Sequence, residues 1–294
     1  MHGVFVIDKP SGWTSHDVVG KMRRIAGTRR VGHLGTLDPM ATGVLPLVVG
    51  GATRLSQFYV RSEKLYEGVV RFGQATDTYD ADGTPLGPKI AYEVTPEGLE
   101  ILLARFRGTQ LQTPPPVSAK KIAGTRAYQL ARKNIPVELK PVEVTIHSLQ
   151  LMGCEGNEAR LRVQCSAGTY LRSIAHDLGQ AIGCGAHLSS LRRLASGDFT
   201  IEQAHSLEEL AQLASESRLR EALMPASTLL PEFPCETLDP ITAGQVRQGR
   251  DFRVSPFRAR KDAQFVKALT EDGALLAIGE IRLPNLYHPI LVLD

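Results

Sequence analysis

The sequence predicts an α+β protein built from two domains of unequal size. The chain has 294 residues, and at roughly 100 to 200 residues per domain this length favours one large domain with a smaller companion. Helix-like and strand-like apolar patterns both occur up to residue 223. Pro225, Pro231 and Pro234 then space out an extended linker, and only short strand-like runs follow it. We therefore expect domains at residues 1–230 and 231–294.

The composition is that of an ordinary soluble globular protein, with 43% hydrophobic and 22% charged residues and 34 Lys+Arg against 31 Asp+Glu. This balance excludes a disordered chain, a collagen-like chain and a coiled coil. No apolar run approaches the ~20 residues of a membrane span, and the N-terminus lacks the pattern of a signal peptide. We therefore expect no membrane association and a cytoplasmic location.

The four cysteines form no Cys-x-x-Cys pair, and a chain of this length can build its core without disulfides. We therefore expect reduced thiols. One spacing typical of metal ligands joins Cys184 to His187, but no second ligand pair of similar spacing accompanies it. We predict no metal site.

The first elements have clear local signals. The apolar run at residues 4–7 predicts a strand that ends in a loop-forming cluster. Thr14 and Asp17 have the spacing of a capping box, and the apolar residues that follow them recur at helical spacing. Residues 32–53 predict a structured loop that runs into a buried segment, and the alternation at residues 66–72 predicts another strand.

The middle of the chain alternates helices and strands. Residues 95–106 begin with an N-cap, a first-turn proline and an acid, which predicts a helix. Residues 144–151 and 159–165 predict an antiparallel pair of strands. Residues 170–182 carry the strongest helical stripe of the chain, and Arg172 lies off that stripe. The later elements predicted are a helix over residues 206–223 and strands over residues 265–269, 275–281 and 290–293.

Basic residues are concentrated in three segments that contain almost no acids. Residues 21–30 and 120–133 carry five basic residues each and no acid, and residues 247–261 carry six with one acid. A chain that keeps carboxylates away from particular surfaces is typical of polyanion binding. The alternative is that each run is only a solvated helix face. Three such runs in one chain favour a nucleic-acid partner.

Several catalytic motifs are absent from the sequence. It contains no phosphate-binding loop, no Gly-x-Gly-x-x-Gly, no His-Glu-x-x-His and no Gly-x-Ser-x-Gly. The pattern of the zinc nucleobase deaminases is missing as well. We therefore do not expect ATP hydrolysis, dinucleotide redox chemistry or zinc-dependent hydrolysis.

The most unusual segment is residues 32–47, GHLGTLDPMATGVLPL. Its three glycines permit close approach of the backbone to a ligand. Asp38 is the only carboxylate in the segment, and Pro39 restricts the backbone beside it. Taken alone, an Asp-Pro pair more often begins a helix, with the aspartate as N-cap.

Four motifs together resemble those of the TruB-type tRNA pseudouridine synthases, from about residue 3 to the end of the chain. They are DKPSGWTSHD at residues 8–17, the segment 32–47, PPVSAK at 115–120 with YQLAR at 128–132, and GTYLRS at 168–173 with GCGAHL at 183–188 and LRR at 191–193. Val117 stands where the family often has an aromatic residue, and Arg54 where it often has lysine. The resemblance implies an α+β, pseudouridine synthase-like catalytic domain with a mixed β-sheet, followed by a small PUA-like β domain.

The resemblance also implies catalytic roles. Asp38 would be the catalytic nucleophile, Arg172 would hold it ionised, and Tyr66 would pack on the target base and help to remove its C5 proton. The reaction cuts the N-glycosidic bond of uridine, turns the base and rejoins it through C5, so no cofactor is expected. Without the resemblance, Tyr66 would be taken as a plain strand aromatic and Arg172 as a solvent-facing helix residue.

The implied substrate is the uridine at position 55 of the tRNA T-loop, which must be flipped out of its stack. The resemblance assigns His33 to the vacated space and Tyr170 and Leu191 to the base pocket. We place Lys9 with these substrate-binding residues, as a supporting structural or backbone contact. The insertion at about residues 113–140 is expected to close over the T-arm, and the C-terminal domain is expected to bind RNA.

Alternative functions stay open at this stage. The RNA-guided dyskerin-type enzymes have a similar catalytic motif, but the insertion and the absence of long Lys-rich tails favour a guide-free enzyme. We expect a monomer, because nothing in the sequence indicates an obligate dimer. A tRNA chaperone and an N-glycoside hydrolase that releases uracil are candidates from other classes. The sequence also leaves open whether Asp38 attacks C1′, attacks C6 or removes the 2′ proton.

Overall fold

The protein folds around two β-sheets, and the computed structural model describes residues 1–117, 121–122, 125–126, 139–255 and 263–293. The larger sheet contains β1 (Gly3–Lys9), β2 (Val31–His33), β3 (Thr42–Val49), β4 (Lys64–Phe72), β7 (Gly108–Gln112), β10 (Val142–Glu155), β11 (Glu158–Cys165), β12 (Ala186–Ser196), β13 (Phe199–Thr200) and β14 (Met224–Pro225). The smaller sheet contains β15 (Cys235–Thr237), β16 (Phe252–Arg253), β17 (Phe265–Leu269), β18 (Leu275–Leu283) and β19 (Leu286–Val292). Two short ladders complete the strands, β5 (Ala75–Thr76) with β6 (Pro85–Leu86) and β8 (Lys121–Ile122) with β9 (Thr125–Arg126).

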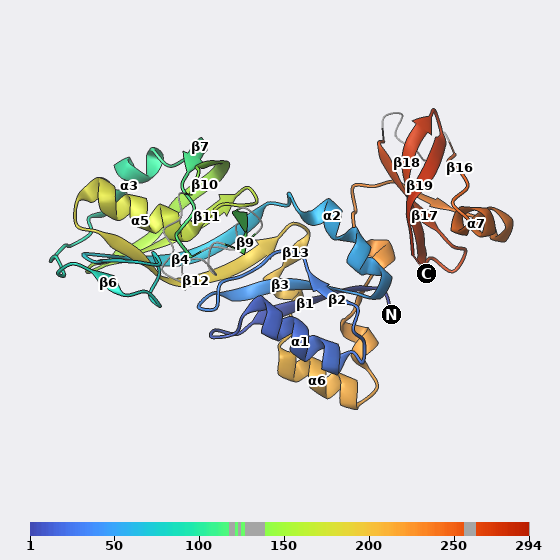
Figure 1. The fold of residues 1–294 in the computed structure, drawn as a ribbon, viewed down its shortest axis with the longest axis horizontal. Coiled ribbons are helices and arrows are strands. Elements are labelled where there is room, and N and C mark those ends of the chain that lie inside the picture. The colour runs from blue at the N-terminus through green and yellow to red at the C-terminus, as the bar shows by residue number, and fades with distance from the viewer. Residues whose placement is uncertain (118–120, 123–124, 127–138, 256–262, 294) are drawn as a thin grey trace.

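The larger sheet has the strand order β14-β1-β3-β12-β4-β11-β10-β7, with β2 attached to β3 and β13 to β12. The smaller sheet has the order β15-β17-β18-β19-β16 and lies at one end of the molecule (Figure 1). The predicted α+β class with a separate C-terminal β-sheet is confirmed. Most of the predicted insertion, its basic run and residues 256–262 of the C-terminal basic run lie outside the described residues.

Helices cover the larger sheet in two groups. The helices are α1 (Ser15–Ile25), α2 (Ser56–Tyr59), α3 (Pro96–Ala104), α5 (Leu171–Ile182), α6 (Leu207–Ser215) and, in the smaller sheet's domain, α7 (Pro240–Arg247). Figure 1 shows α1 and α6 side by side at one half of the sheet and α3 and α5 at the other. None of the described helices has the length and apolar composition needed to cross a bilayer.

The N-terminal elements form where the sequence predicts them. β1 pairs antiparallel with β3 along its whole length. The capping box of α1 is present: Thr14 Oγ1 accepts from the Asp17 N–H at 3.1 Å, and the Asp17 carboxylate accepts from the Thr14 N–H at 2.9 Å. The predicted structured loop that runs into a buried segment is confirmed at residues 32–53, because the apolar residues after the loop form the buried strand β3, which pairs with β1 and β2.

The larger sheet is mixed because β12 crosses back to lie parallel with β3. Its parallel register pairs Arg192 with Thr42 and Arg193 with Gly43, whereas β12 is antiparallel to β4 on its other side. The two backbones approach closely at this point. Gly43 has a φ of +95°, and a Cβ atom there would lie 2.2 Å from the Arg193 carbonyl oxygen. Only glycine fits this position without displacement of the backbone.

Two later elements differ from the prediction. The helix expected over residues 206–223 ends at Ser215, because Ser217 adopts a φ of +60° and the chain continues as a 3-10 turn, η3 (Leu219–Ala222). The short helix α7 is a feature that the sequence analysis missed. Its signals were nonetheless present, since Asp239 caps it and Pro240 occupies its first turn.

The smaller sheet packs against the larger one. Val4 and Val44 of the larger sheet share a hydrophobic cluster with Ile278 and Leu291 of the smaller sheet. Lys267 on β17 is buried, and its ammonium donates to the carbonyls of the linker residues 227 and 229 at 3.0 and 2.8 Å. These contacts fix the path of the linker, and the boundary after residue 230 stays a prediction.

The close approach at Gly43 predicts a specific loss of stability. We expect Gly43→Ala to lower the free energy of unfolding by about 3 to 5 kcal/mol, since it adds both backbone strain and a clash. Chemical denaturation measures this change. Gly183→Ala is the matched control, because Gly183 also has a positive φ but open space around it, and its cost should be about 1 to 2 kcal/mol. Equal losses in the two variants would contradict the account.

Candidate active site

A cavity of about 450 Å³ opens in the larger domain, a volume within the usual range for small-ligand sites. The loop between β2 and β3, the first residues of β4 and the first turn of α5 form its walls. Six of the seven predicted site residues line it, namely His33, Asp38, Tyr66, Tyr170, Arg172 and Leu191. Six residues that were predicted from the sequence motifs therefore lie around one cavity in the fold.

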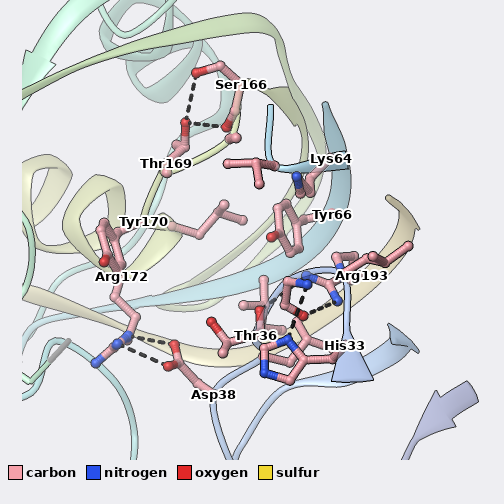
Figure 2. Close-up of a pocket in the computed structure, with 18 of the residues that line it drawn as sticks. His33, Thr36, Asp38, Lys64, Tyr66, Ser166, Thr169, Tyr170, Arg172 and Arg193 are labelled. Atoms are coloured by element: carbon pink, nitrogen blue, oxygen red, sulfur yellow. Dashed lines mark hydrogen bonds and ion pairs between the residues drawn. The ribbon is translucent and has the colours of Figure 1, made fainter. Parts of the chain in front are cut away.

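Asp38 and Arg172 form an ion pair at the edge of this cavity. Arg172 Nε lies 2.9 Å from Asp38 Oδ2, and Nη2 donates to Oδ1 at 3.2 Å. Figure 2 shows this two-point contact, with the Tyr66 and His33 rings across the cavity from it. The Arg172 side chain is only 4% exposed and that of Asp38 is 37% exposed. The interpretation of Arg172 as a solvent-facing residue is therefore wrong, because its side chain turns inward from the first turn of α5.

The Arg172 guanidinium also bonds three other groups. Nη1 contacts the Asp80 carboxylate at 3.2 Å and donates to the carbonyl of residue 78 at 3.1 Å. Nη2 donates to the Val117 carbonyl at 2.9 Å. Asp80 is 5% exposed and was not predicted, because it stands in a loop with two other aspartates and no spacing in the sequence singles it out. One arginine thus joins two carboxylates and two backbone segments.

The segment that carries Asp80 is held against α5 by a stacked pair of rings. Tyr79 and His176 stack with centroids 3.8 Å apart and an interplanar angle of 12°. Tyr79 has a φ of +66°, an unusual conformation for a residue with a side chain. His176 lies one helical turn after Arg172, so the stack fixes the Asp80 segment beside the guanidinium.

Burial raises the pKa of Asp38, and the Arg172 guanidinium opposes that rise. Asp80 adds to the rise through like-charge repulsion. The carboxylate form of Asp38 is therefore lost at a higher pH than for a solvent-exposed aspartate as the solution is acidified. Removal of the guanidinium would leave only the smaller effect of Lys9 to oppose burial.

Tyr66 faces the cavity from β4 and is 9% exposed. Burial raises the pKa of its hydroxyl, while the nearby Arg193 guanidinium opposes the rise, so Tyr66 stays a neutral phenol near pH 7. Arg193 is itself buried and donates to the carbonyls of Val44, Thr36 and Gly35 at 2.7, 3.2 and 3.3 Å. It therefore fixes the loop that carries Asp38.

Lys64 also lines the cavity, although the sequence analysis did not select it. Its ammonium donates to the carbonyl of Ser62, and it lines the cavity two residues before Tyr66 on the same strand. Burial lowers the pKa of Lys64 to about 8. The lysine therefore remains mostly protonated at pH 7 and adds a positive charge to the cavity wall.

Lys9 is the one predicted site residue that lies away from the cavity. It is completely buried, and its ammonium donates to the carbonyls of Pro10, Trp13 and Pro39 at 2.8, 2.7 and 3.1 Å. These bonds use all three of its N–H donors. Lys9 therefore does not contact the cavity as a substrate-binding residue would. It makes the supporting backbone contact that we also expected, and this contact ties the first motif to the Asp38 loop.

The remaining predicted residues are placed by the surrounding backbone. His33 ends β2, and its Nδ1 accepts from the Gly35 N–H at 3.3 Å. Tyr170 is the N-cap of α5, where its N–H and C=O both bond the side chain of the buried Gln112 at 2.8 and 3.0 Å. Leu191 is 8% exposed on β12. These three residues present two rings and an apolar side chain to the cavity.

Cys184 and His187, whose spacing resembles a metal motif, bond to the backbone. Cys184 Sγ contacts the Gly185 carbonyl at 3.3 Å, and His187 Nδ1 lies 2.8 Å from the Gln74 carbonyl. Among the described residues, no group of three or more His, Cys, Asp or Glu side chains is arranged to hold a metal ion. All four cysteines are free.

Comparisons with known proteins identify the family of the chain. Residues 23–171 match the family described as TruB family pseudouridylate synthase (N terminal domain), and residues 172–231 match the tRNA pseudouridylate synthase B C-terminal domain. The tRNA pseudouridine synthase B of Solibacter usitatus is 62% identical over 293 residues, covering 100% of each chain. That of Aquifex aeolicus is 42% identical over 284 residues, covering 96% of each.

Solved structures give the same result for the fold. A chain from the crystal structure of a Cbf5-Nop10-Gar1 complex has a TM-score of 0.72 and 28% identity, covering 96% of this chain and 79% of that one. A chain from an H/ACA RNP bound to a substrate RNA containing 2′-deoxyuridine has a TM-score of 0.72 and 24% identity, covering 99% and 84%. The fold and the cavity thus define a pseudouridylate synthase. Within that class, the chain belongs to the TruB family.

The opposing effects on Asp38 predict a measurable shift. We expect Arg172→Met to raise the pKa of Asp38 further, because burial remains while the neighbouring cation is removed. Carbon-13 NMR of aspartate labelled at Cγ follows this titration. Arg162→Met is the control, since Arg162 pairs with Glu67 instead. A lower or unchanged pKa of Asp38 in Arg172→Met would contradict the electrostatic account.

Proposed function

We propose that the protein is a tRNA pseudouridine synthase that isomerises the uridine at position 55 of the T-loop. The observation that carries the proposal is the Asp38–Arg172 ion pair beside Tyr66 in one cavity. Its tRNA substrate is further supported by the names of the relatives, which are tRNA pseudouridine synthases B across almost the whole chain. Position 55 rests on the resemblance of the four sequence motifs.

The reaction requires few protein groups. The N1–C1′ bond breaks, a C5–C1′ bond forms, N1 gains a proton and C5 loses one, so the product is an isomer of the substrate. This balance needs neither oxidant nor cofactor. We assign Asp38 as the nucleophile, and an ionised carboxylate serves equally in attack on C1′, attack on C6 or removal of the 2′ proton.

The other groups take supporting roles in this proposal. Arg172 favours the charged form of Asp38 and holds both of its oxygens. The Tyr66 ring packs on the base, and its phenol assists the transfer of the C5 proton. Tyr170 and Leu191 line the base site, and His33 occupies the space that the flipped uridine leaves. Lys9 acts on the reaction only by positioning the Asp38 loop.

We also propose that the enzyme is guide-free, monomeric and cytoplasmic. In this proposal the insertion at residues 113–140, most of which lies outside the described residues, binds RNA, and the C-terminal PUA-like domain contacts the tRNA. The structural neighbours come from complexes that contain further proteins or RNA. We propose that this enzyme recognises tRNA without a guide.

The first experiment tests the activity itself. An unmodified tRNA transcript labelled with tritium at C5 of uridine is incubated with the protein in EDTA without nucleotide. We expect one tritium released per tRNA, none with Asp38→Asn, and none from the target when uridine 55 is replaced by cytidine. Tight binding without tritium release would favour the chaperone function, and free uracil would indicate N-glycoside hydrolysis.

The buried network around Arg172 predicts a separate effect on turnover. We expect Asp80→Asn to lower kcat roughly 10- to 100-fold, because the guanidinium loses one of the two charges that orient it toward Asp38. KM should change little, since Asp80 does not line the cavity. Asp82→Asn, in the same loop but exposed, should leave kcat unchanged. An unaltered kcat in Asp80→Asn would remove Asp80 from the positioning network.

A further inference from the structure

We propose that Arg24, Arg29 and Arg30 form a phosphate-binding surface for the tRNA stem that adjoins the T-loop. The inference rests on the proposed function, because it takes tRNA as the ligand. It concerns a different part of the molecule, since none of the three arginines lines the cavity. We call these residues the α1 arginine surface.

The three arginines are exposed and lie in a segment of the chain without acids. Residues 21–30 contain no Asp or Glu, and no carboxylate in the described part of the chain forms an ion pair with any of the three. Some other surface arginines are paired, namely Arg71 with Glu158, Arg162 with Glu67, Arg192 with Asp8 and Arg218 with Glu216 and Glu221. What distinguishes the three arginines is their concentration within seven residues of a segment that contains no acid. Like charges gathered without counterions repel one another, so a polyanion stabilises such a surface.

Helix stability accounts for only part of the cluster. Arg24 lies in the last turn of α1, where a cation interacts favourably with the helix dipole. Arg29 and Arg30 lie beyond the end of the helix, where that effect has faded. Among the described contacts, no ion pair or helix-dipole interaction accounts for the positive charges of Arg29 and Arg30. A phosphate ligand would account for the charges of all three arginines.

The backbone beneath the surface is held in place. The Thr28 N–H bonds the Arg23 carbonyl at 3.2 Å, and the Arg30 N–H bonds Thr28 Oγ1 at 3.2 Å. The Arg30 carbonyl accepts from the Gly50 N–H at 2.8 Å. Because the backbone is already fixed, binding requires ordering of the arginine side chains but not of the backbone that carries them. The bidentate geometry of arginine suits phosphate oxygens.

The surface lies close to the cavity along the chain. Figure 1 shows α1 ending beside β2, and β2 runs from Val31 directly to His33, which lines the cavity. Three residues of strand span about 10 Å. Phosphates a few nucleotides from a uridine held in the cavity would therefore reach the arginines. The geometry places the stem backbone on this side of the site.

The test measures how tRNA affinity depends on salt. Each phosphate contact contributes about one unit to the slope of log K against log salt concentration. We expect Arg29→Gln/Arg30→Gln to make the slope shallower by about two and to raise KM, with kcat at saturating tRNA unchanged. Arg218→Gln/Arg220→Gln removes the same charge from an acid-rich exposed segment and should leave the slope as it is.

The outcomes separate this inference from the proposed function. If the wild-type enzyme releases tritium while both double variants keep the wild-type slope, the α1 arginine surface is wrong and the proposed function stands. If the wild-type protein releases no tritium but Arg29→Gln/Arg30→Gln still loses slope, the surface stands and the catalytic assignment fails. Equal losses of slope in both double variants would mean a general charge effect and would overturn the surface. Circular dichroism confirms that each variant is folded.

Discussion

The buried guanidinium of Arg172 is the interaction on which the site depends. It contacts Asp38, Asp80 and the carbonyls of residues 78 and 117, so segments far apart in the sequence meet at one cation. A buried charge is tolerated only when partners compensate it on every side. The β2–β3 loop, the loop after β5 and the chain after β7 are therefore placed by the same requirement. The Asp38 carboxylate, the proposed nucleophile, is positioned as one of these compensating partners.

Two further buried cations hold the Asp38 loop from other directions. Lys9 bonds the carbonyl of Pro39 after the aspartate, and Arg193 bonds those of Gly35 and Thr36 before it. The loop thus has fixed backbone on both sides of the proposed nucleophile. Such preorganisation is a main source of catalytic rate enhancement. Burial raises the pKa of Asp38, and the positive charges around it limit that rise.

The sequence predicted elements whose signals are local. The capping box at Thr14 and the helix that ends at Gly183 follow from neighbouring residues, and both are present. The site residues around the cavity came from the motifs, but the inward direction of Arg172 and the role of Asp80 depend on tertiary contacts. Periodicity assigns a polar residue beside an apolar stripe to solvent. Arg172 turns inward instead because its guanidinium pairs with the buried Asp80 carboxylate, a contact that periodicity cannot predict. The end of α6 at Ser215 was missed because a polar stretch carries no periodicity.

We propose that the cavity holds a flipped uridine with a sugar or base carbon close to Asp38. A crystal structure of the protein bound to a T-arm hairpin tests it, with 5-fluorouridine at the target position because that base has no C5 proton to lose. The account predicts the base between Tyr66 and Leu191, and a sugar or base carbon roughly 3 to 3.5 Å from an Asp38 oxygen. A target base that remains stacked in its loop, or that occupies another cavity, would contradict it.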